Sequence, residues 1–310
     1  MKIDISILIP FLNESENIQF LVESLTDFCA KNNTLKIEVI FIDDGSKDNS
    51  CNLLKNATIT NFEAKIIKLS QNYGSHAALR AGIFHAKGEY ITFMYADLQD
   101  PLELVNQLYN EIQIENKEIV WAVRSEKQSW FSGFYARLMQ RFAVKNFPKN
   151  GFDIVMFSKK VQKLLNQNIE SNSSVFLQIL TLGFNQKTIQ YQKQPRKAGK
   201  SKWTFNKKIK LLIDSFVAFS FFPIRLVSIV GIILFIIGIL FAIYLIIRKL
   251  LLDDIKEGWT ALASILMIGF GITNISLGII AEYLWRTLDT SRKRPVFIID
   301  EIVEINQNKV

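Results

Sequence analysis

Two long uncharged segments constrain the fold of this chain more than any other feature. Residues 226–247 and 260–281 are each 22 residues long and contain no Asp, Glu, Lys or Arg. At about 1.5 Å per residue, each would span roughly 33 Å as a helix, enough for a hydrocarbon core of about 30 Å. Buried helices of soluble proteins rarely lack a polar face. The sequence therefore predicts a hairpin of two transmembrane helices.

The residues around these segments indicate their orientation. Their outer flanks contain Lys207, Lys208, Lys210, Arg225, Arg286, Arg292, Lys293 and Arg294, whereas the connection at 248–259 mixes three basic with three acidic residues. Because Lys and Arg are enriched in cytoplasmic flanks, both termini are expected in the cytoplasm. The apolar run of 'MKIDISILIP' is too short for a signal peptide, and Cys29 and Cys51 lie in helical patterns that suit a reducing compartment.

A basic tract precedes the first uncharged segment. The net charge of the chain is +8, and the 43 residues between Glu170 and Asp214 contain no acid. Their positive charges are Lys187, Lys193, Arg196, Lys197, Lys200, Lys202, Lys207, Lys208 and Lys210. The tract predicts a site for anionic headgroups or a phosphate, with a solvated face that only fixes topology as the alternative. Nucleic acid is disfavoured because the tract adjoins the bilayer.

The first two thirds of the chain alternate between two patterns. Apolar runs such as 'ISILIP', 'IEVIFIDD', 'AKIIKLS' and 'EYITFMYAD' are separated by helical stretches such as 'ENIQFLVESLTDFCAK' and 'SHAALRAGIFHAK'. This alternation predicts βαβ units and a mainly parallel, Rossmann-like sheet covered on both faces. We assign residues 1–204 to this α/β domain, 205–225 to an amphipathic interfacial helix or a plain connector, 226–284 to the hairpin and 285–310 to a C-terminal tail.

Polar residues follow each predicted strand. They are Asn13 and Glu14, then Asp43 and Asp44, then Gln71 and Asn72, then Asp97, Gln99 and Asp100. Ligands of doubly wound sheets bind beyond the carboxyl ends of the strands, so these residues predict one site. Neither a GxGxxG motif nor a P-loop occurs, which leaves dinucleotide and ATPase interpretations without support.

Acids at the strand ends and bases nearby suit a nucleotide diphosphate held through a divalent cation. Asp97 and Gln99 are candidate ligands for Mg²⁺ or Mn²⁺, completed by phosphate oxygens and water. The alternative for such an acidic turn is a helix N-cap, which we assign to Asp100 because Pro101 follows it. In 'DDGSKDNS', Asp44 is the candidate ligand for a ribose or base, Gly45 permits close approach, and Asp48 is the expected cap.

Several motifs in order carry a family resemblance. 'ISILIPFLNESENI', 'VIFIDDGSKDNS', 'LSQNYGSHAALRAGIFHAKGEYITFMYADLQDPLE', 'PRKAGKSKW' and 'AEYLWRTLDTSRKRPVFII' together resemble the polyisoprenyl-phosphate glycosyltransferases. These are GT-A-fold, family-2 relatives of dolichol-phosphate mannose synthase and the bactoprenol glucosyltransferases. The resemblance covers nearly the whole chain, including both uncharged segments.

The resemblance implies roles for individual residues. The family pattern assigns nucleotide binding to Pro10, Leu12, Glu14 and Asp44. It assigns binding of the metal and diphosphate to Asp97 and Gln99, and contact with the phosphates to Arg124. Binding of the diphosphate and lipid phosphate is assigned to Arg196 and Lys202, and assistance of the attacking oxygen to Asp153. Two positions depart from the family pattern. Tyr95 replaces the usual first acid of the metal pair, and Val155 replaces a common arginine. These departures imply an altered donor sugar or weaker metal affinity, and they leave a degenerate, inactive relative open.

The resemblance implies inverting transfer of one sugar, most simply from a UDP-hexose, to undecaprenyl or another polyprenyl phosphate at the cytoplasmic face of a bacterial inner membrane. The product would serve the modification or assembly of a cell-surface glycan. Alternatives are a membrane-anchored transferase acting on a lipid-linked oligosaccharide and a non-catalytic scaffold. Small residues in the uncharged segments leave a homo-oligomer open. The sugar itself is not encoded in any motif.

Overall fold

The computed structural model describes residues 2–125, 130–144, 146–148, 151–169, 174–194, 258–292 and 294–305, with isolated positions between 220 and 251. The chain divides into two compact units. One consists of Met1–Leu211 together with Pro295–Val310, and the other is Leu212–Arg294. The predicted helix at 205–225 lies outside the described residues except at Ser220 and Phe222.

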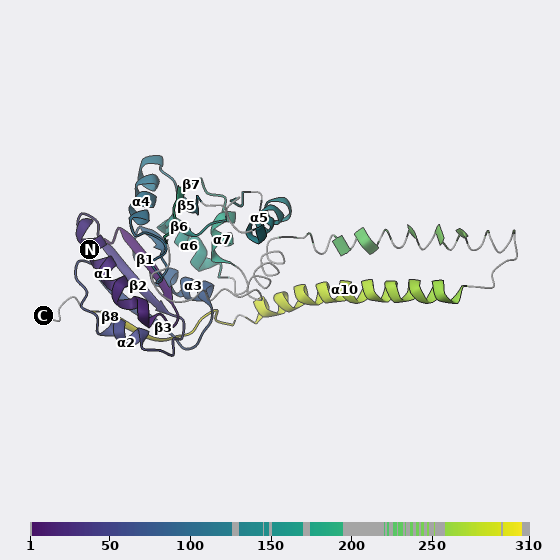
Figure 1. The fold of residues 1–310 in the computed structure, drawn as a ribbon, viewed down its shortest axis with the longest axis horizontal. Helices are drawn as coiled ribbons and strands as arrows, with labels where there is room; N and C mark the ends of the chain where they lie inside the picture. Colours follow the sequence, from purple (N-terminus) through teal and green to yellow (C-terminus); the bar gives the residue numbers. More distant parts are fainter. Residues whose placement is uncertain are drawn as a thin grey trace. The chain divides into compact units, whose positions relative to one another are not determined.

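The first unit is built on one eight-stranded sheet with the order β7-β5-β6-β4-β1-β2-β3-β8 (Figure 1). The strands are β1 (Ile5–Phe11), β2 (Ile37–Asp43), β3 (Glu63–Leu69), β4 (Tyr90–Phe93), β5 (Ile119–Arg124), β6 (Ile154–Ser158), β7 (Gln186–Tyr191) and β8 (Ile299–Ile305). The neighbours β1–β2, β1–β4, β2–β3 and β5–β7 are parallel, whereas β6 and β8 are antiparallel to their neighbours. The predicted GT-A-like α/β fold with a mostly parallel sheet is confirmed.

These strand directions place the polar segments together. Because β6 runs against both β4 and β5, strand β5 runs in the same direction as β4 and β1. The carboxyl ends of β1 to β5 and β7, and the amino end of β6, therefore lie at one edge. This is the edge at which the sequence predicts a site.

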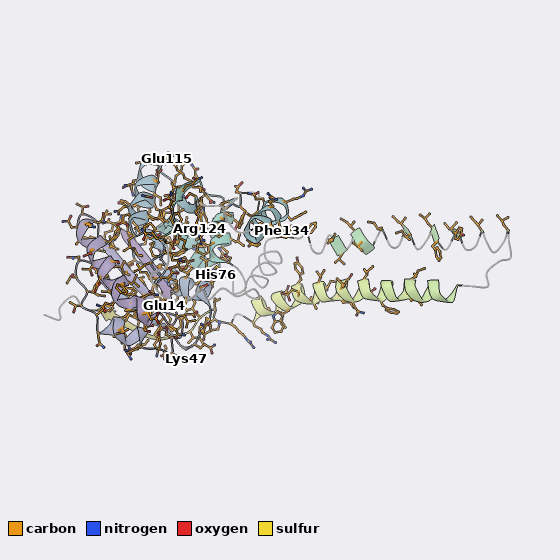
Figure 2. All side chains as sticks on the ribbon, in the orientation of Figure 1. Glu14, Lys47, His76, Glu115, Arg124 and Phe134 are labelled. Atoms are coloured by element: carbon orange, nitrogen blue, oxygen red, sulfur yellow. The ribbon has the colours of Figure 1, made fainter. Side chains whose placement is uncertain are left out.

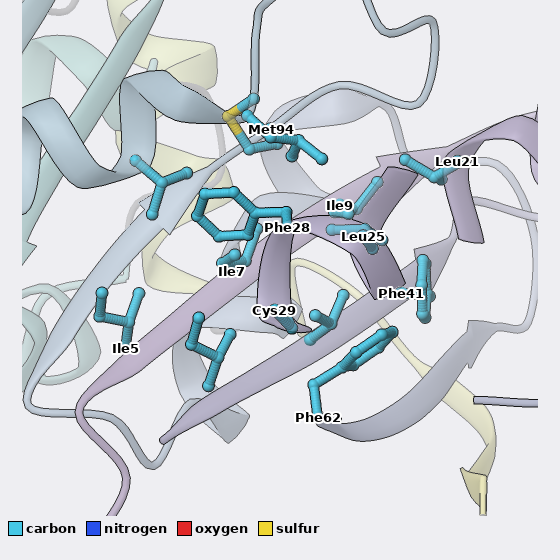
Figure 3. Close-up of a cluster of buried hydrophobic side chains, with 14 of the residues drawn as sticks. Ile5, Ile7, Ile9, Leu21, Leu25, Phe28, Cys29, Phe41, Phe62 and Met94 are labelled. Carbon is cyan, nitrogen blue, oxygen red and sulfur yellow. The ribbon is translucent and has the colours of Figure 1, made fainter. Parts of the chain in front are cut away.

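Helices cover both faces of the sheet (Figure 1). They are α1 (Ser15–Lys31), α2 (Ser50–Lys55), α3 (Ser75–His85), α4 (Glu103–Glu115), α5 (Trp130–Phe142), α6 (Lys159–Gln167) and α7 (Val175–Thr181). Side chains of β1 alternate between the faces. Ile5, Ile7 and Ile9 pack in one cluster with Leu21 and Leu25 of α1 (Figure 3).

The opposite face of β1 packs closely against α3. A Cβ atom at Gly82 of α3 would lie 3.2 Å from Leu8 Cδ1 and 2.9 Å from Ile42 Cδ1. Fully burying each such side chain contributes about 1.5–3 kcal/mol. Apolar residues on both faces explain why the strands read as continuous hydrophobic runs in the sequence.

Strand β8 comes from the predicted C-terminal tail. It pairs antiparallel with β3, with Val303 opposite Ile66. Two ion pairs accompany the pairing: Lys68 Nζ lies 2.8 Å from Asp300 Oδ2, and Lys55 Nζ lies 2.7 Å from Glu301 Oε2. The tail therefore completes the sheet on the β3 side, although nothing in 'FIIDEIVEI' marks it as an edge strand of a distant domain.

The second unit contains α10 (Trp259–Ser291), a helix of 33 residues that includes the predicted span 260–281. Large apolar side chains of α10 are exposed, among them Phe270 at 67% and Ile275 at 64%. In the part of the chain that the structure describes, no helix is long and apolar enough to cross a membrane. Residues 226–247 are described only at isolated positions.

Candidate active site

Acids after β1 and β2 hold the beginnings of two helices. Glu14 Oε2 accepts a hydrogen bond of 2.7 Å from Asn17 Nδ2, and its backbone N–H donates to Ser50 Oγ at 2.9 Å. Asp48 accepts the backbone N–H groups of Ser15 at 3.1 Å and Ser50 at 3.0 Å. Ser15 and Ser50 are the first residues of α1 and α2. The N-cap of α2 is Asn49, so Asp48 is not the cap residue that the sequence predicts, although its carboxylate accepts a backbone N–H at the first residue of each of the two helices.

Pro10 lies near the end of β1, opposite Ile42 of β2. A proline removes one ladder donor, and it is tolerated here because β4 ends at Phe93, opposite Leu8. Leu12, the next predicted nucleotide-binding residue, is half-buried just beyond β1. Both residues thus lie at the edge where the polar strand ends meet.

Asp44 ties the end of β2 to the loop after β3. It is 4% exposed, its Oδ1 accepts the backbone N–H of Tyr73 at 2.8 Å, and its Oδ2 accepts that of Gly74 at 3.0 Å. Burial raises the pKa of Asp44 to about 6, against the opposing effect of these two N–H groups. The residue predicted to bind a ribose or base is therefore also a structural clamp between two loops.

Gly45 allows the loop after β2 to lie very close to the loop after β3. Its φ of +75° lies in the left-handed region, and a Cβ atom there would lie 2.6 Å from the backbone carbon of Gln71. The close neighbour of Gly45 is another loop of the same chain, and the approach of a ribose or base to Gly45 stays a prediction.

Asp97 and Gln99 lie in one turn after β4. Asp97 Oδ1 accepts the backbone N–H of Gln99 at 3.3 Å, and Leu98 between them has a φ of +53°. Burial raises the pKa of Tyr95, and the carboxylates of Asp100 and Asp153 add to the effect. The phenol therefore stays neutral at physiological pH and does not replace the missing carboxylate as a ligand for a hard cation.

The donor set at this turn suits a metal that arrives with a nucleotide. Magnesium is commonly bound by one or two protein carboxylates together with phosphates and water. Asp97 and Gln99 supply one carboxylate and one amide oxygen. Among the described residues, no group of three or more His, Cys, Asp or Glu side chains is arranged to hold a metal ion. The residues fit Mg²⁺ or Mn²⁺ bound together with a diphosphate.

Asp100 is not the helix cap that the sequence predicts. The N-cap of α4 is Leu102, without a side-chain cap hydrogen bond. Asp100 Oδ1 instead accepts the hydroxyl of Tyr191 at 2.5 Å and lies 3.4 Å from Lys193 Nζ. The prediction was wrong because the fold brings the end of β7 to this carboxylate, and a local pattern does not report that contact. Sequence reasoning missed Tyr191 altogether, and Lys193 was visible only as a member of the basic tract.

Arg124 and Asp153, both predicted to act in the site, form a bidentate ion pair. Arg124 Nε lies 2.8 Å from Asp153 Oδ2, and Nη2 lies 2.5 Å from Oδ1. Arg124 is labelled in Figure 2. Arg124 ends β5, and Asp153 directly precedes β6. Val155 is fully buried within β6, opposite Trp121. An arginine at this position, which the family resemblance led us to expect, would therefore be buried as well. Arg196 and Lys202 lie outside the described residues.

Comparison with known proteins identifies the family. Residues 6–154 match the family Glycosyl transferase family 2. An uncharacterized glycosyltransferase of Synechocystis sp. is 31% identical over 97% of this chain and 96% of its own length. The uncharacterized glycosyltransferase YkcC of Bacillus subtilis is 30% identical over 99% and 97%. An undecaprenyl-phosphate 4-deoxy-4-formamido-L-arabinose transferase of Proteus mirabilis is 30% identical over 98% and 95%. With relatives of this identity matched almost end to end, the chain belongs to glycosyltransferase family 2 and is a glycosyltransferase.

Proposed function

We propose that this chain transfers one sugar from a nucleotide diphosphate sugar, with UDP as the expected nucleotide, to a polyprenyl phosphate. The observation that carries the proposal is the match to the Proteus mirabilis protein, whose name specifies an undecaprenyl-phosphate acceptor. That match covers 98% of this chain, so it extends well beyond the family domain at 6–154. It includes the basic tract and both uncharged segments, the parts that a lipid phosphate acceptor would require.

The donor is proposed to lie at the sheet edge formed by the ends of β1, β2 and β4. Pro10, Leu12, Glu14 and Asp44 would contact the nucleoside, and Arg124 would contact the diphosphate. Asp97 and Gln99 would hold Mg²⁺ or Mn²⁺, which neutralises charge on the diphosphate when bound. Asp44 joins the loop after β2 to the loop after β3. These loops are therefore already ordered before a donor binds, and little further conformational entropy is lost on binding, which supports this assignment.

The acceptor phosphate is proposed to attack the anomeric carbon from the face opposite the nucleotide. A new carbon–oxygen bond forms to the lipid phosphate, the bond to the nucleoside diphosphate breaks with its electron pair leaving on that diphosphate, and the configuration inverts. A phosphate monoester has a second pKa near 6, so the nucleophile is largely anionic at pH 7. The reaction therefore needs little assistance from a side chain acting as a general base.

Asp153 is therefore assigned an orienting role. Its two oxygens are both engaged by Arg124, which supports positioning of the guanidinium toward phosphate more than proton abstraction. Arg196 and Lys202 are proposed to hold the diphosphate and lipid phosphate together against their mutual repulsion.

We further propose that 226–247 and 260–281 form a membrane hairpin in a bacterial inner membrane, with both termini cytoplasmic. The absence of charge in both segments and the exposed apolar side chains of α10 support this arrangement. The domain boundaries at 204, 225 and 284 belong to the same proposal, and the oligomeric state and sugar are left open.

The test is a reconstituted transfer reaction. Purified full-length protein is incubated with undecaprenyl phosphate or, in parallel, with a lipid-linked oligosaccharide. The donors are a panel of UDP- and GDP-hexoses plus nucleotide-activated 4-deoxy-4-formamido-L-arabinose, with Mg²⁺, Mn²⁺ or EDTA. Mass spectrometry should detect a monoglycosylated lipid phosphate with one donor. The Asp300→Asn variant, altered at an exposed residue, is the control for expression and purification and should form the same product as the parent chain. Product on a lipid-linked oligosaccharide only, or no product from folded protein with any donor, would overturn the proposal.

A further inference from the structure

The buried carboxylate of Asp100 is the centre of a contact between two loops that are far apart in the sequence. Its side chain is 0% exposed, and Tyr191 and Lys193 both reach its Oδ1. The backbone N–H of Gln194 donates to the carbonyl of Gln99 at 2.8 Å. Three contacts therefore join residues 99–100 to residues 191–194.

The position of this contact links the two halves of the proposed site. Gln99 belongs to the turn that carries Asp97, and Gln194 lies in the basic tract, two residues before Arg196. Tyr191 is also the last residue of β7, paired with Arg124 of β5. Tyr191 is therefore tied to the turn after β4 through its side chain and to β5 through the strand pairing.

Stability alone is a poor explanation for Asp100. Burying a carboxylate is costly unless its oxygens are paired, and Asp100 Oδ2 is buried without a hydrogen-bond partner among the described residues. If an apolar side chain of similar size replaced Asp100, it would fill the same space beside the Tyr191 phenol without the cost of burying a carboxylate. The carboxylate is instead suited to fix direction, since it draws a hydroxyl and an ammonium group to one oxygen atom.

We propose that Asp100 is a positioning residue that locks the segment after β7 onto the turn carrying Asp97 and Gln99. The turn on the donor side and the part of the basic tract that directly follows β7 are then held together. This inference rests on the proposed function for its kinetic consequence, but the contact itself is testable without any activity.

The direct test is hydrogen exchange in the full-length protein. The peptide covering 186–194 should exchange about ten-fold faster at its C-terminal end in Asp100→Ala, because the tether that shields the Gln194 amide is lost. Asp100→Asn keeps an acceptor for the Tyr191 hydroxyl and should lie between Asp100→Ala and the parent chain. Asp300→Asn, which alters an exposed ion pair with Lys68, should leave this peptide unchanged.

The kinetic test separates positioning from general damage. Asp100→Ala should raise KM for undecaprenyl phosphate about ten-fold while KM for the nucleotide sugar changes less than about three-fold, since the turn after β4 keeps its own Asp97 bond. Tyr191→Phe should shift KM in the same direction, and combining Tyr191→Phe with Asp100→Ala should add little.

Unchanged exchange in Asp100→Ala overturns the inference, as does an equal rise of both KM values together with a lowered unfolding temperature. If Asp100→Ala is too unstable to assay, Tyr191→Phe decides the same question. A parent chain without glycolipid product would overturn the proposed function, and the exchange result would still decide the role of Asp100.

Discussion

The loops after β2 and β4 lie at the same edge of the sheet and are both rich in carboxylates, yet different groups hold them. After β2, Asp44 accepts the backbone N–H groups of Tyr73 and Gly74. After β4, Asp100 binds the side chain of Tyr191, 91 residues away in the sequence. The carboxylate in the first loop accepts main-chain donors, which every residue except proline supplies, whereas the carboxylate in the second contacts particular side chains from a distant segment.

This difference indicates where the site tolerates change. Side chains next to a backbone donor can vary without loss of the contact, because each residue other than proline carries an N–H. A contact between two side chains fails when either is replaced, and a buried partner is then left unsatisfied. Substitutions after β4 and at the ends of β5 and β7 should therefore affect function more than those around Asp44.

The largest effect is expected at Arg124. Arg124→Lys should lower kcat by about 10²–10³-fold, because an ammonium group does not reproduce the planar bidentate contact with Asp153 or a phosphate. The glycolipid assay measures kcat, and circular dichroism checks the fold. The double variant with Asp153→Asn should lose little more than Arg124→Lys alone, since the two act as a unit. A lysine variant with at least half the parent kcat would contradict this role.

A backbone change should break the loop after β2. Gly45→Ala should lower the free energy of unfolding by about 2–3 kcal/mol, because the new Cβ would collide with the backbone of Gln71. Thermal unfolding of the full chain in detergent measures the change. Gly183→Ala is the matched control, since Gly183 has the same φ of +75° but nothing within 4 Å, and it should cost only about 1 kcal/mol. Equal losses at both glycines would show that conformational strain alone matters.

Substitutions at Tyr95 test whether this residue contributes to binding of the metal. Tyr95→Asp adds a second carboxylate near Asp97 and should tighten Mn²⁺ binding in the presence of UDP about ten-fold, measured by isothermal titration calorimetry. Tyr95→Phe should leave Mn²⁺ affinity unchanged, because the phenol is not a ligand. Tighter Mn²⁺ binding by the parent chain than by Tyr95→Phe would disprove that statement.

The smallest effect concerns the titration of Asp44. Its folded pKa of about 6 lies above the ordinary value of 3.8, so the folded state binds the proton more tightly than the unfolded state. The associated stability is present below about pH 4 and is lost as the pH rises through about 6. Relative to Asp44→Asn, the parent chain should lose about 2–4 °C in unfolding temperature between pH 5 and pH 7. Parallel profiles for the two proteins would rule this linkage out.

Much of the first unit was predictable because its signals are local. Continuous apolar runs identified β1 to β4, and helical periodicity identified α1 and α3, since each pattern reports burial of that segment alone. Asp97 and Gln99, two residues apart, were predicted as joint metal ligands, and the structure places them in one turn after β4. Strand β8 was not foreseen, because its pairing with β3 joins Ile66 to Val303, more than two hundred residues along the chain.

The sequence by itself determined the family, the α/β pattern, the edge of the sheet at which polar residues gather, and the two uncharged segments. The tertiary structure alone decided what each carboxylate binds. Asp44 clamps a neighbouring loop, Asp153 pairs with Arg124, and Asp100 holds Tyr191 instead of capping α4. The physical reason is that burial and secondary structure follow from short-range patterns, whereas a side-chain contact depends on which distant strands become neighbours and in which direction they run.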